Sequence, residues 1–191
     1  MLIVDAARDV IAGRGLFATT VRDIAETAGV SAGTLTYHFT GIAEILSEVL
    51  EREMALFYEP LVQRARDAER GHDALQTLID GFFADDDRTV QHWRLWLDFW
   101  SVSAHDEQYA SWQREIYLRW HADVLRMLTL ACTQGDLATV DAETAVSDFL
   151  AMFDGLAVQA YLPRSPIRPD DARRHLTDWV RRTLADPARR P

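Results

Sequence analysis

Lysine does not occur in this 191-residue chain, so arginine supplies all 20 of its basic side chains. Against 30 acidic residues these leave a net charge of −10, which argues against a protein that coats nucleic acid non-specifically. Cysteine is nearly absent as well, because Cys132 stands alone and cannot form an internal disulfide. No cluster of residues has metal-ligand spacing, so neither a disulfide framework nor a bound metal is expected.

Long apolar runs are missing too. No stretch approaches the ~20 consecutive apolar residues of a membrane-spanning helix, and no apolar signal segment follows a basic N-terminus. We therefore expect a cytoplasmic protein without a membrane partner. Gly-rich phosphate loops and nucleophile elbows are also missing, and the histidines are scattered, so we expect neither an enzyme nor a cofactor.

The pattern that remains is helical. Apolar residues recur at helical spacing between glycine, proline and aspartate breaks, and no period-2 alternation of any length occurs. The sequence therefore predicts an all-α fold of about nine helices, with three short N-terminal helices followed by a helical bundle. The expected bundle helices are 42–70 with a kink at Pro60, 73–83, 87–104, 106–133, 141–162 and 170–185.

Residues 20–39 contain two helix starts separated by a glycine. Thr20 can cap the first helix, and Asp23, three residues on, favours the same N-terminus. Gly29 can adopt the left-handed conformation that ends this helix, and Ser31 can then cap the second one. Two short helices joined by a tight turn predict a helix-turn-helix, whose second helix suits the major groove of DNA.

The second helix of this motif has an inner and an outer side. Leu35 and Phe39 fall on the inner side, toward the first helix. Hydroxyl groups and the N–H groups of helix N-termini can hold phosphates, and an aromatic tip can reach base edges. The candidate DNA-binding residues are therefore Thr20, Ser31, Ala32, Gly33, Thr34, Thr36, Tyr37 and His38.

These motifs resemble the DNA-binding domain of the tetracycline-repressor (TetR) family. The matching segments include Gly15-Leu16-Phe17-Ala18-Thr19-Thr20-Val21, Asp23-Ile24-Ala25, Ala28-Gly29-Val30-Ser31 and Tyr37-His38-Phe39. The resemblance implies a homodimer that binds a palindromic operator and is released by a small effector, most simply as a repressor. We expect residues 1–46, which we name the reading head, to bind DNA, and residues 47–191 to bind the ligand and dimerise.

The reading head departs from the family pattern in its charge. Positions that are often basic in the family hold Ala32 and Ile42, and residues 1–47 carry three arginines against five acidic residues, a net charge of −2. The alternative left open is a helical ligand-binding or protein-docking dimer that has lost DNA binding. A basic arm encoded upstream of Met1 would count against this alternative.

Aromatic residues gather in two of the expected bundle helices. Positions 93, 96 and 100 share one helical face, as do positions 109, 112, 116 and 120 of the next helix. Ligand pockets between bundle helices are mostly apolar with a few polar groups, and tryptophan N–H groups need partners when buried. The candidate ligand-binding residues are Trp93, Trp96, Trp100, Trp112, Tyr117, Trp120 and Phe153.

The same region resembles the C-terminal domain of the TetR subgroup that includes choline-responsive regulators of the betaine pathway. The resemblance is carried by Trp96-Leu97-Asp98-Phe99-Trp100, Tyr117-Leu118-Arg119-Trp120, Gly135-Asp136-Leu137 and Asp154-Gly155-Leu156-Ala157-Val158-Gln159-Ala160. Aromatic faces can hold a quaternary ammonium by cation–π attraction, with Asp98 or Glu107 as counter-ion. An uncharged hydrophobic effector would fit an aromatic pocket equally well.

The last two expected helices carry more apolar surface than one subunit can cover. The helix at 141–162 is apolar nearly all round, and the helix at 170–185 continues the pattern. In the family the last two helices form a four-helix dimer interface, and a two-fold dimer would suit a palindromic operator. We expect this interface to depend on Phe153 and Val180.

Overall fold

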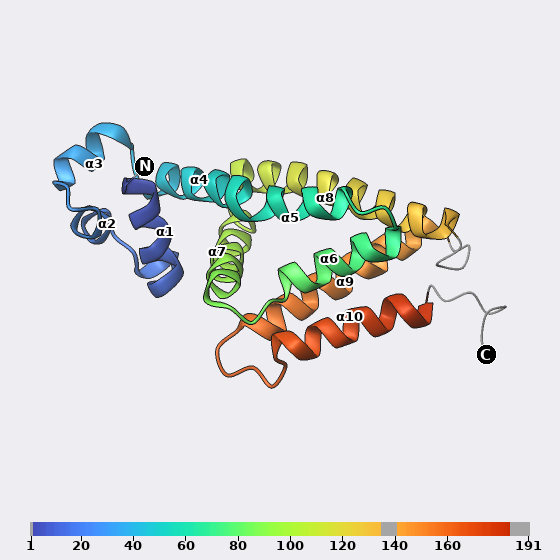
Figure 1. The fold of residues 1–191 in the computed structure, drawn as a ribbon. Helices are drawn as coiled ribbons and strands as arrows, with labels where there is room; N and C mark the ends of the chain where they lie inside the picture. Colours follow the sequence, from blue (N-terminus) through green and yellow to red (C-terminus); the bar gives the residue numbers. More distant parts are fainter. Residues whose placement is uncertain (1, 135–140, 184–191) are drawn as a thin grey trace.

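The computed structural model describes residues 2–134 and 141–183, and every regular element in these ranges is helical (Figure 1). The α-helices are α1 (Leu2–Arg14), α2 (Val21–Ala28), α3 (Ala32–His38), α4 (Ile42–Glu53), α5 (Glu59–Arg66), α6 (Gly71–Phe82), α7 (Asp87–Ser103), α8 (Glu107–Thr133), α9 (Ala142–Tyr161) and α10 (Pro169–Thr183). A 3₁₀ turn, η1 (Leu16–Ala18), follows α1, and a π-helical turn, η2 (Met54–Tyr58), joins α4 to α5.

The prediction of an all-α fold is confirmed for the described residues. Because α4, η2 and α5 follow one another without a break, they correspond to the single helix expected at 42–70. The helix expected at 73–83 begins earlier, at Gly71, and the last two residues of the range 170–185 lie outside the described residues, as does the segment that begins at Gly135. None of the described helices has the length and apolarity needed to cross a bilayer.

One helix stands between the two ends of the molecule. In Figure 1, α1 to α3 gather at one end, α4 and α5 lead away from them beside α8, and α6, α9 and α10 form the other end. Helix α7 crosses this arrangement and packs against α1 as well as against α8 and α9. The buried apolar side chains form one continuous cluster from Ala7 in α1 to Val180 in α10. The reading head is therefore fixed to the bundle by a shared core.

Local chemistry sets the ends of the short helices as predicted. The Asp23 amide donates to Thr20 Oγ1 over 3.2 Å, and the Thr20 amide donates to Asp23 Oδ2 over 2.9 Å, which makes a reciprocal capping box. Gly29 ends α2 at a φ of 67°, where a side chain would be strained. Ser31 Oγ accepts from the Thr34 amide over 3.0 Å and caps α3.

The disturbance predicted at Pro60 takes the form of η2, directly before the proline. Pro60 has no N–H to donate to the carbonyl of Leu56, four residues earlier. Arg88 of α7 donates to that carbonyl instead, over 2.8 Å, and its guanidinium lies 5.6 Å from the centre of the Phe57 ring. The continuous helix formed by α4, η2 and α5 is thus held to α7 at its π-helical turn.

Phe153 and Val180 do not lie on an outer face, so the expectation that a dimer depends on them was wrong. Both are buried inside one subunit, with 2% and 3% of their surface exposed. Phe153 packs against Phe82 and Trp120, which makes it part of the interior of the bundle. The sequence pattern indicated that α9 is apolar on two faces, but it did not predict which face packs inside the subunit.

Gly71 allows α6 to start against the backbone of α8, and this gives a test of the fold. A Cβ at Gly71 would overlap backbone atoms of Met127 and Ala131. We predict that Gly71→Ala lowers the free energy of unfolding by about 1–3 kcal/mol, measured by urea denaturation. The control Gly13→Ala, where a Cβ meets nothing within 4 Å in a helix, should be neutral or stabilising by up to ~1 kcal/mol. Equal effects of the two changes would contradict this packing.

Candidate functional site

All the predicted DNA-binding residues lie on the exposed surface of the reading head. Leu35 is fully buried and Phe39 is half-buried, so the inner and outer sides of α3 are as the pattern predicted. Tyr37 is 85% exposed and its ring meets that of His38 edge to face, with centroids 5.2 Å apart. The exposed set is Thr20, Ser31, Ala32, Gly33, Thr34, Thr36, Tyr37 and His38.

The charge of this surface is weakly suited to phosphate. Arg8 is turned toward the bundle, and Arg14 pairs with Asp23 over 3.0 Å. At the start of α4, Glu44 accepts hydrogen bonds from the amide and the hydroxyl of Thr40, and these bonds lower the pKa of Glu44. The helix N-terminus next to α3 therefore carries a negative charge, which opposes the approach of a phosphate.

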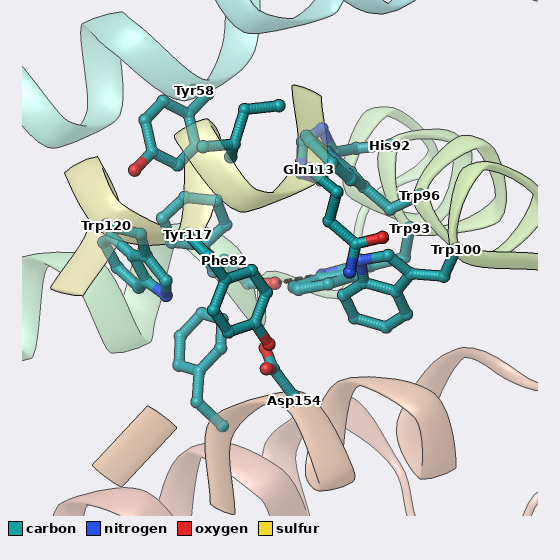
Figure 2. Close-up of a pocket in the computed structure, with 12 residues that line it drawn as sticks. Tyr58, Phe82, His92, Trp93, Trp96, Trp100, Gln113, Tyr117, Trp120 and Asp154 are labelled. Atoms are coloured by element: carbon teal, nitrogen blue, oxygen red, sulfur yellow. Dashed lines mark hydrogen bonds between the residues drawn. The ribbon is translucent and has the colours of Figure 1, made fainter. Parts of the chain in front are cut away.

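A cavity lies deep in the bundle, where α7 and α8 face α6 and α9 (Figure 2). The space not occupied by protein atoms is about 440 Å³, including its opening, which is at the lower end of the range for ligand pockets. Twelve residues line it, nearly all of them aromatic or apolar: Tyr58, Phe82, His92, Trp93, Trp96, Trp100, Gln113, Ile116, Tyr117, Trp120, Phe153 and Asp154.

Six of the seven predicted ligand-binding residues line this cavity, and Trp112 does not. Trp112 is half-buried and packs edge to face on Phe99, with centroids 5.1 Å apart. The face of α8 that meets the cavity carries Gln113, Ile116, Tyr117 and Trp120. Position 112 lies about 100° around the helix from position 113, which turns its side chain away.

The aromatic walls hold one another in place through edge contacts and one strong hydrogen bond. The indole N–H of Trp93 donates to the carbonyl of Phe82 over 2.7 Å, so this buried donor is satisfied. Phe82 meets Trp120 at 5.5 Å and Phe153 at 5.4 Å between ring centroids, both edge to face. The cavity is therefore bounded by rings whose orientations are mutually fixed.

Asp154 places a carboxylate in this aromatic environment. Its side chain points from α9 into the cavity (Figure 2), and no described residue donates a hydrogen bond to it or pairs with it. Burial alone raises the pKa of Asp154 to about 7. The group is therefore about half ionised near neutral pH, and a cation beside it would favour the charged form.

Neither counter-ion expected from the sequence lies in the cavity. The carboxylate of Asp98 accepts a hydrogen bond from the Leu16 amide over 2.8 Å, so it faces the reading head. It lies about 200° around α7 from Trp96, on the opposite side of the helix. Glu107 is exposed at the start of α8. The structure corrects both assignments, because Asp154 is the only carboxylate among the residues that line the cavity.

The polar groups that the sequence reasoning missed come from distant segments. Tyr58 of η2 has a buried hydroxyl that makes no hydrogen bond to any described residue, and burial raises its pKa above the usual range. Phe82 and His92 enter from the end of α6 and the start of α7. The one available signal was Asp154, a single carboxylate in the otherwise apolar stretch 149–158.

An exposed helix-turn-helix joined by a common core to an aromatic cavity in the bundle defines a ligand-responsive transcriptional regulator. Residues 3–49 match the family model for bacterial regulatory proteins of the tetR family, and residues 44–185 match that for the C-terminal part of BetI-type transcriptional repressors. The chain belongs to the TetR family of DNA-binding regulators. The curated relatives that it matches are transcriptional regulators, not enzymes.

Individual relatives match along nearly the whole chain. The regulator BetI of Vibrio parahaemolyticus is 29% identical over 186 residues, covering 95% of this chain and 90% of its own. BetI of Cronobacter sakazakii is 28% identical, covering 97% and 91%. Among solved structures, a transcriptional regulator from Saccharomonospora viridis in complex with choline is 25% identical, with a TM-score of 0.91 and coverage of 97% and 96%. A regulator from Rhodococcus, 22% identical with a TM-score of 0.81, shares the fold.

The exposed Tyr37 provides a test of the DNA-facing side. We predict that Tyr37→Ala weakens binding to a selected operator duplex by about 1–3 kcal/mol, measured by fluorescence anisotropy, if the ring makes a specific contact. Thermal stability should hardly change because the side chain is 85% exposed. Leu35→Ala, which empties a buried position, should instead destabilise the fold by about 2–5 kcal/mol. Unchanged operator affinity in Tyr37→Ala would show that α3 presents another side to DNA.

Proposed function

We propose that this protein is a cytoplasmic, homodimeric repressor that a small quaternary ammonium of the choline type releases from its operator. The observation that carries the proposal is the unpaired carboxylate of Asp154 inside an aromatic cavity. Residues 1–46 serve as the DNA-binding domain and residues 47–191 as the effector-binding and dimerisation domain. The protein needs no cofactor and catalyses no reaction.

A cationic effector fits this cavity better than an uncharged one. A buried carboxylate without a partner is destabilised by desolvation, and a cation beside it relieves this penalty. Tryptophan and tyrosine faces attract a quaternary ammonium through their quadrupoles, by up to ~2 kcal/mol where water is excluded. No arginine lines the cavity, so a ligand with its own carboxylate would find no cationic partner among the residues that line it. The hydroxyl of Tyr58 and the amide of Gln113 are available to a neutral polar arm of the ligand.

The choline complex of the Saccharomonospora viridis regulator supports this choice of ligand class. That protein has the same architecture over nearly the whole chain, with a TM-score of 0.91. The aromatic lining described here is the kind of site that binds quaternary ammonium groups. DNA binding, rather than a dimer that has lost it, is favoured by the preserved caps of α2 and α3 and by the exposure of all the predicted contact residues.

The homodimer is assigned to the outer faces of α9 and α10. A shallow, largely apolar groove lies there, and Trp179 and Met152 in it are partly exposed. A helix pair with an uncovered apolar face is satisfied by the same face of a second copy in a two-fold dimer. The residues that line the groove are Met152, Leu156, Gln159, Ile167, His175, Trp179 and Arg182.

The titration of Asp154 predicts how effector binding depends on pH. With a pKa of about 7 in the empty cavity, the carboxylate is mostly neutral at pH 6 and mostly ionised at pH 8. Choline keeps its charge at both values, so its affinity should be roughly tenfold higher at pH 8, measured by calorimetry. Asp154→Asn should bind choline weakly and without this trend. Equal affinities of the wild type at the two pH values, or equal binding of the uncharged carbon analogue of choline, would contradict a carboxylate-assisted cation site.

A charge placed in this groove should change the mass of the protein in solution from that of a dimer to that of a monomer. Trp179→Arg should leave monomers, measured by light scattering, because it places an unpaired charge in the centre of the apolar groove. The control Arg174→Glu changes the charge of an exposed residue of α10 that does not line this groove, and should remain dimeric. A dimeric Trp179→Arg variant would place the interface elsewhere.

A further inference from the structure

Helix α7 carries two sets of functional side chains on opposite sides. Trp93, Trp96 and Trp100 face the cavity. On the other side, Asp98 accepts from the Leu16 amide, and Arg94 donates to the carbonyl of Ala12 over 3.4 Å. One helix therefore touches both the effector cavity and the reading head, and it places the wall of the cavity close to α1.

A buried chain of hydrogen bonds runs through the same region. His92, which lines the cavity, lies with Nδ1 3.0 Å from Glu53 Oε1. The second oxygen, Glu53 Oε2, accepts from Arg8 Nε of α1 over 2.8 Å. Arg8 also donates from Nη1 to Gln91 of α7 over 2.7 Å. One carboxylate on α4 thus connects a side chain of the cavity wall with a side chain of the reading head.

The protonation states of Glu53 and His92 determine which group donates each hydrogen bond in this chain. Burial opposes the ionisation of Glu53, but hydrogen bonds from His92 and Arg8 outweigh it and hold the pKa of Glu53 at about 2. Burial lowers the pKa of His92, against the opposing effect of Glu53, so the ring is neutral. An ionised carboxylate only accepts, so the histidine must donate from Nδ1. Glu53 is 1% exposed, and losing either donor leaves its charge poorly compensated.

The position of the His92 ring is sensitive to what fills the cavity. Its ring stacks on Phe57 with centroids 3.9 Å apart and meets Trp96 edge to face at 6.0 Å. Packed rings of this kind do not shift singly, because each neighbour occupies the space into which another would move. A ligand that presses on this wall would therefore move the ring together with its hydrogen bond to Glu53.

We propose that Glu53 is a positioning residue that ties the cavity wall to the reading head, so that displacement of the His92 ring by an effector moves α1. The inference rests on the effector site proposed above and adds the residues through which that site reaches DNA. A second link between α4 and α1 lies at the surface and serves as the control. It is the ion pair of Arg52 with Asp5, with a distance of 2.6 Å, and neither residue lines the cavity. The buried link carries the coupling and the surface link does not.

The first experiment needs neither effector nor operator. Hydrogen exchange is measured on α1, with α8 as the internal reference, in the wild type and in His92→Phe, which keeps an aromatic ring but removes the donor. Exchange in α1 should accelerate by about threefold or more, as expected when one bond of a coupled network is lost. In a Glu53→Gln background, His92→Phe should add no further change in α1. The control Trp100→Phe alters the cavity wall without touching Glu53 and should leave α1 protected.

The second experiment measures the coupling itself. The factor by which choline weakens binding to an operator duplex, selected from random DNA by the wild type, is compared among variants. Couplings of this kind are typically about 5- to 150-fold. In Glu53→Gln, which does not line the cavity, the factor should fall to within about twofold of one, while choline still binds the free protein. Asp5→Asn, which breaks the surface link, should retain the wild-type factor.

The outcomes of the two experiments distinguish a failure of the connection through Glu53 from a failure of the proposed effector. Failure of choline to bind the wild type overturns the proposed effector, and the hydrogen-exchange experiment still decides the connection between His92 and α1. Unchanged exchange of α1 in His92→Phe overturns the connection even if choline binds and releases DNA. A wild-type coupling factor in Glu53→Gln, with choline bound, overturns it as well.

Discussion

The buried carboxylate of Glu53 is the constraint on which the relative position of cavity and reading head depends. It lies where α1, α4 and α7 meet, and its two oxygens are held by Arg8 and His92. A buried charge tolerates little change in its donors, since leaving it unpaired is strongly destabilising. The three helices therefore have few alternative arrangements, and the continuous core around them keeps the reading head from moving independently of the bundle.

Desolvation is the physical basis of both the proposed ligand preference and the predicted pH dependence of the cavity. Asp154 has no partner among the described residues, whereas the more deeply buried Glu53 has two donors. Burial acts to raise the pKa of both carboxyl groups, but only Glu53 has hydrogen-bond donors that outweigh it. The pKa of Asp154 is therefore raised to about 7, and the pKa of Glu53 is lowered to about 2. The first carboxylate is ready to accept a cation, and the second is already compensated by the protein.

Features set by neighbouring residues could be predicted from the sequence, and features set by tertiary packing could not. The caps at Thr20 and Ser31 involve partners only three residues away, and helical periodicity brought six of the seven predicted residues to the cavity. Periodicity does not fix the rotation of a helix, which is why Trp112 and Asp98 were placed on the wrong side. Phe82, Tyr58 and His92 reach the cavity from elements whose packing no local pattern contains. In the π-helical turn, Arg88 binds the carbonyl that Pro60 cannot bind, and the sequence shows only the proline.

The charge of the reading head adds little to the attraction between the protein and DNA. With a net charge of −2 over residues 1–47, non-specific attraction to phosphate is weak. Thermodynamic linkage between the cavity and the operator must be reciprocal. The most direct measurement is a choline titration of the wild type, followed by tryptophan fluorescence, with and without saturating operator duplex. Operator should weaken choline binding by the same factor by which choline weakens operator binding, and equal choline affinities in the two titrations would show that the cavity does not control DNA binding.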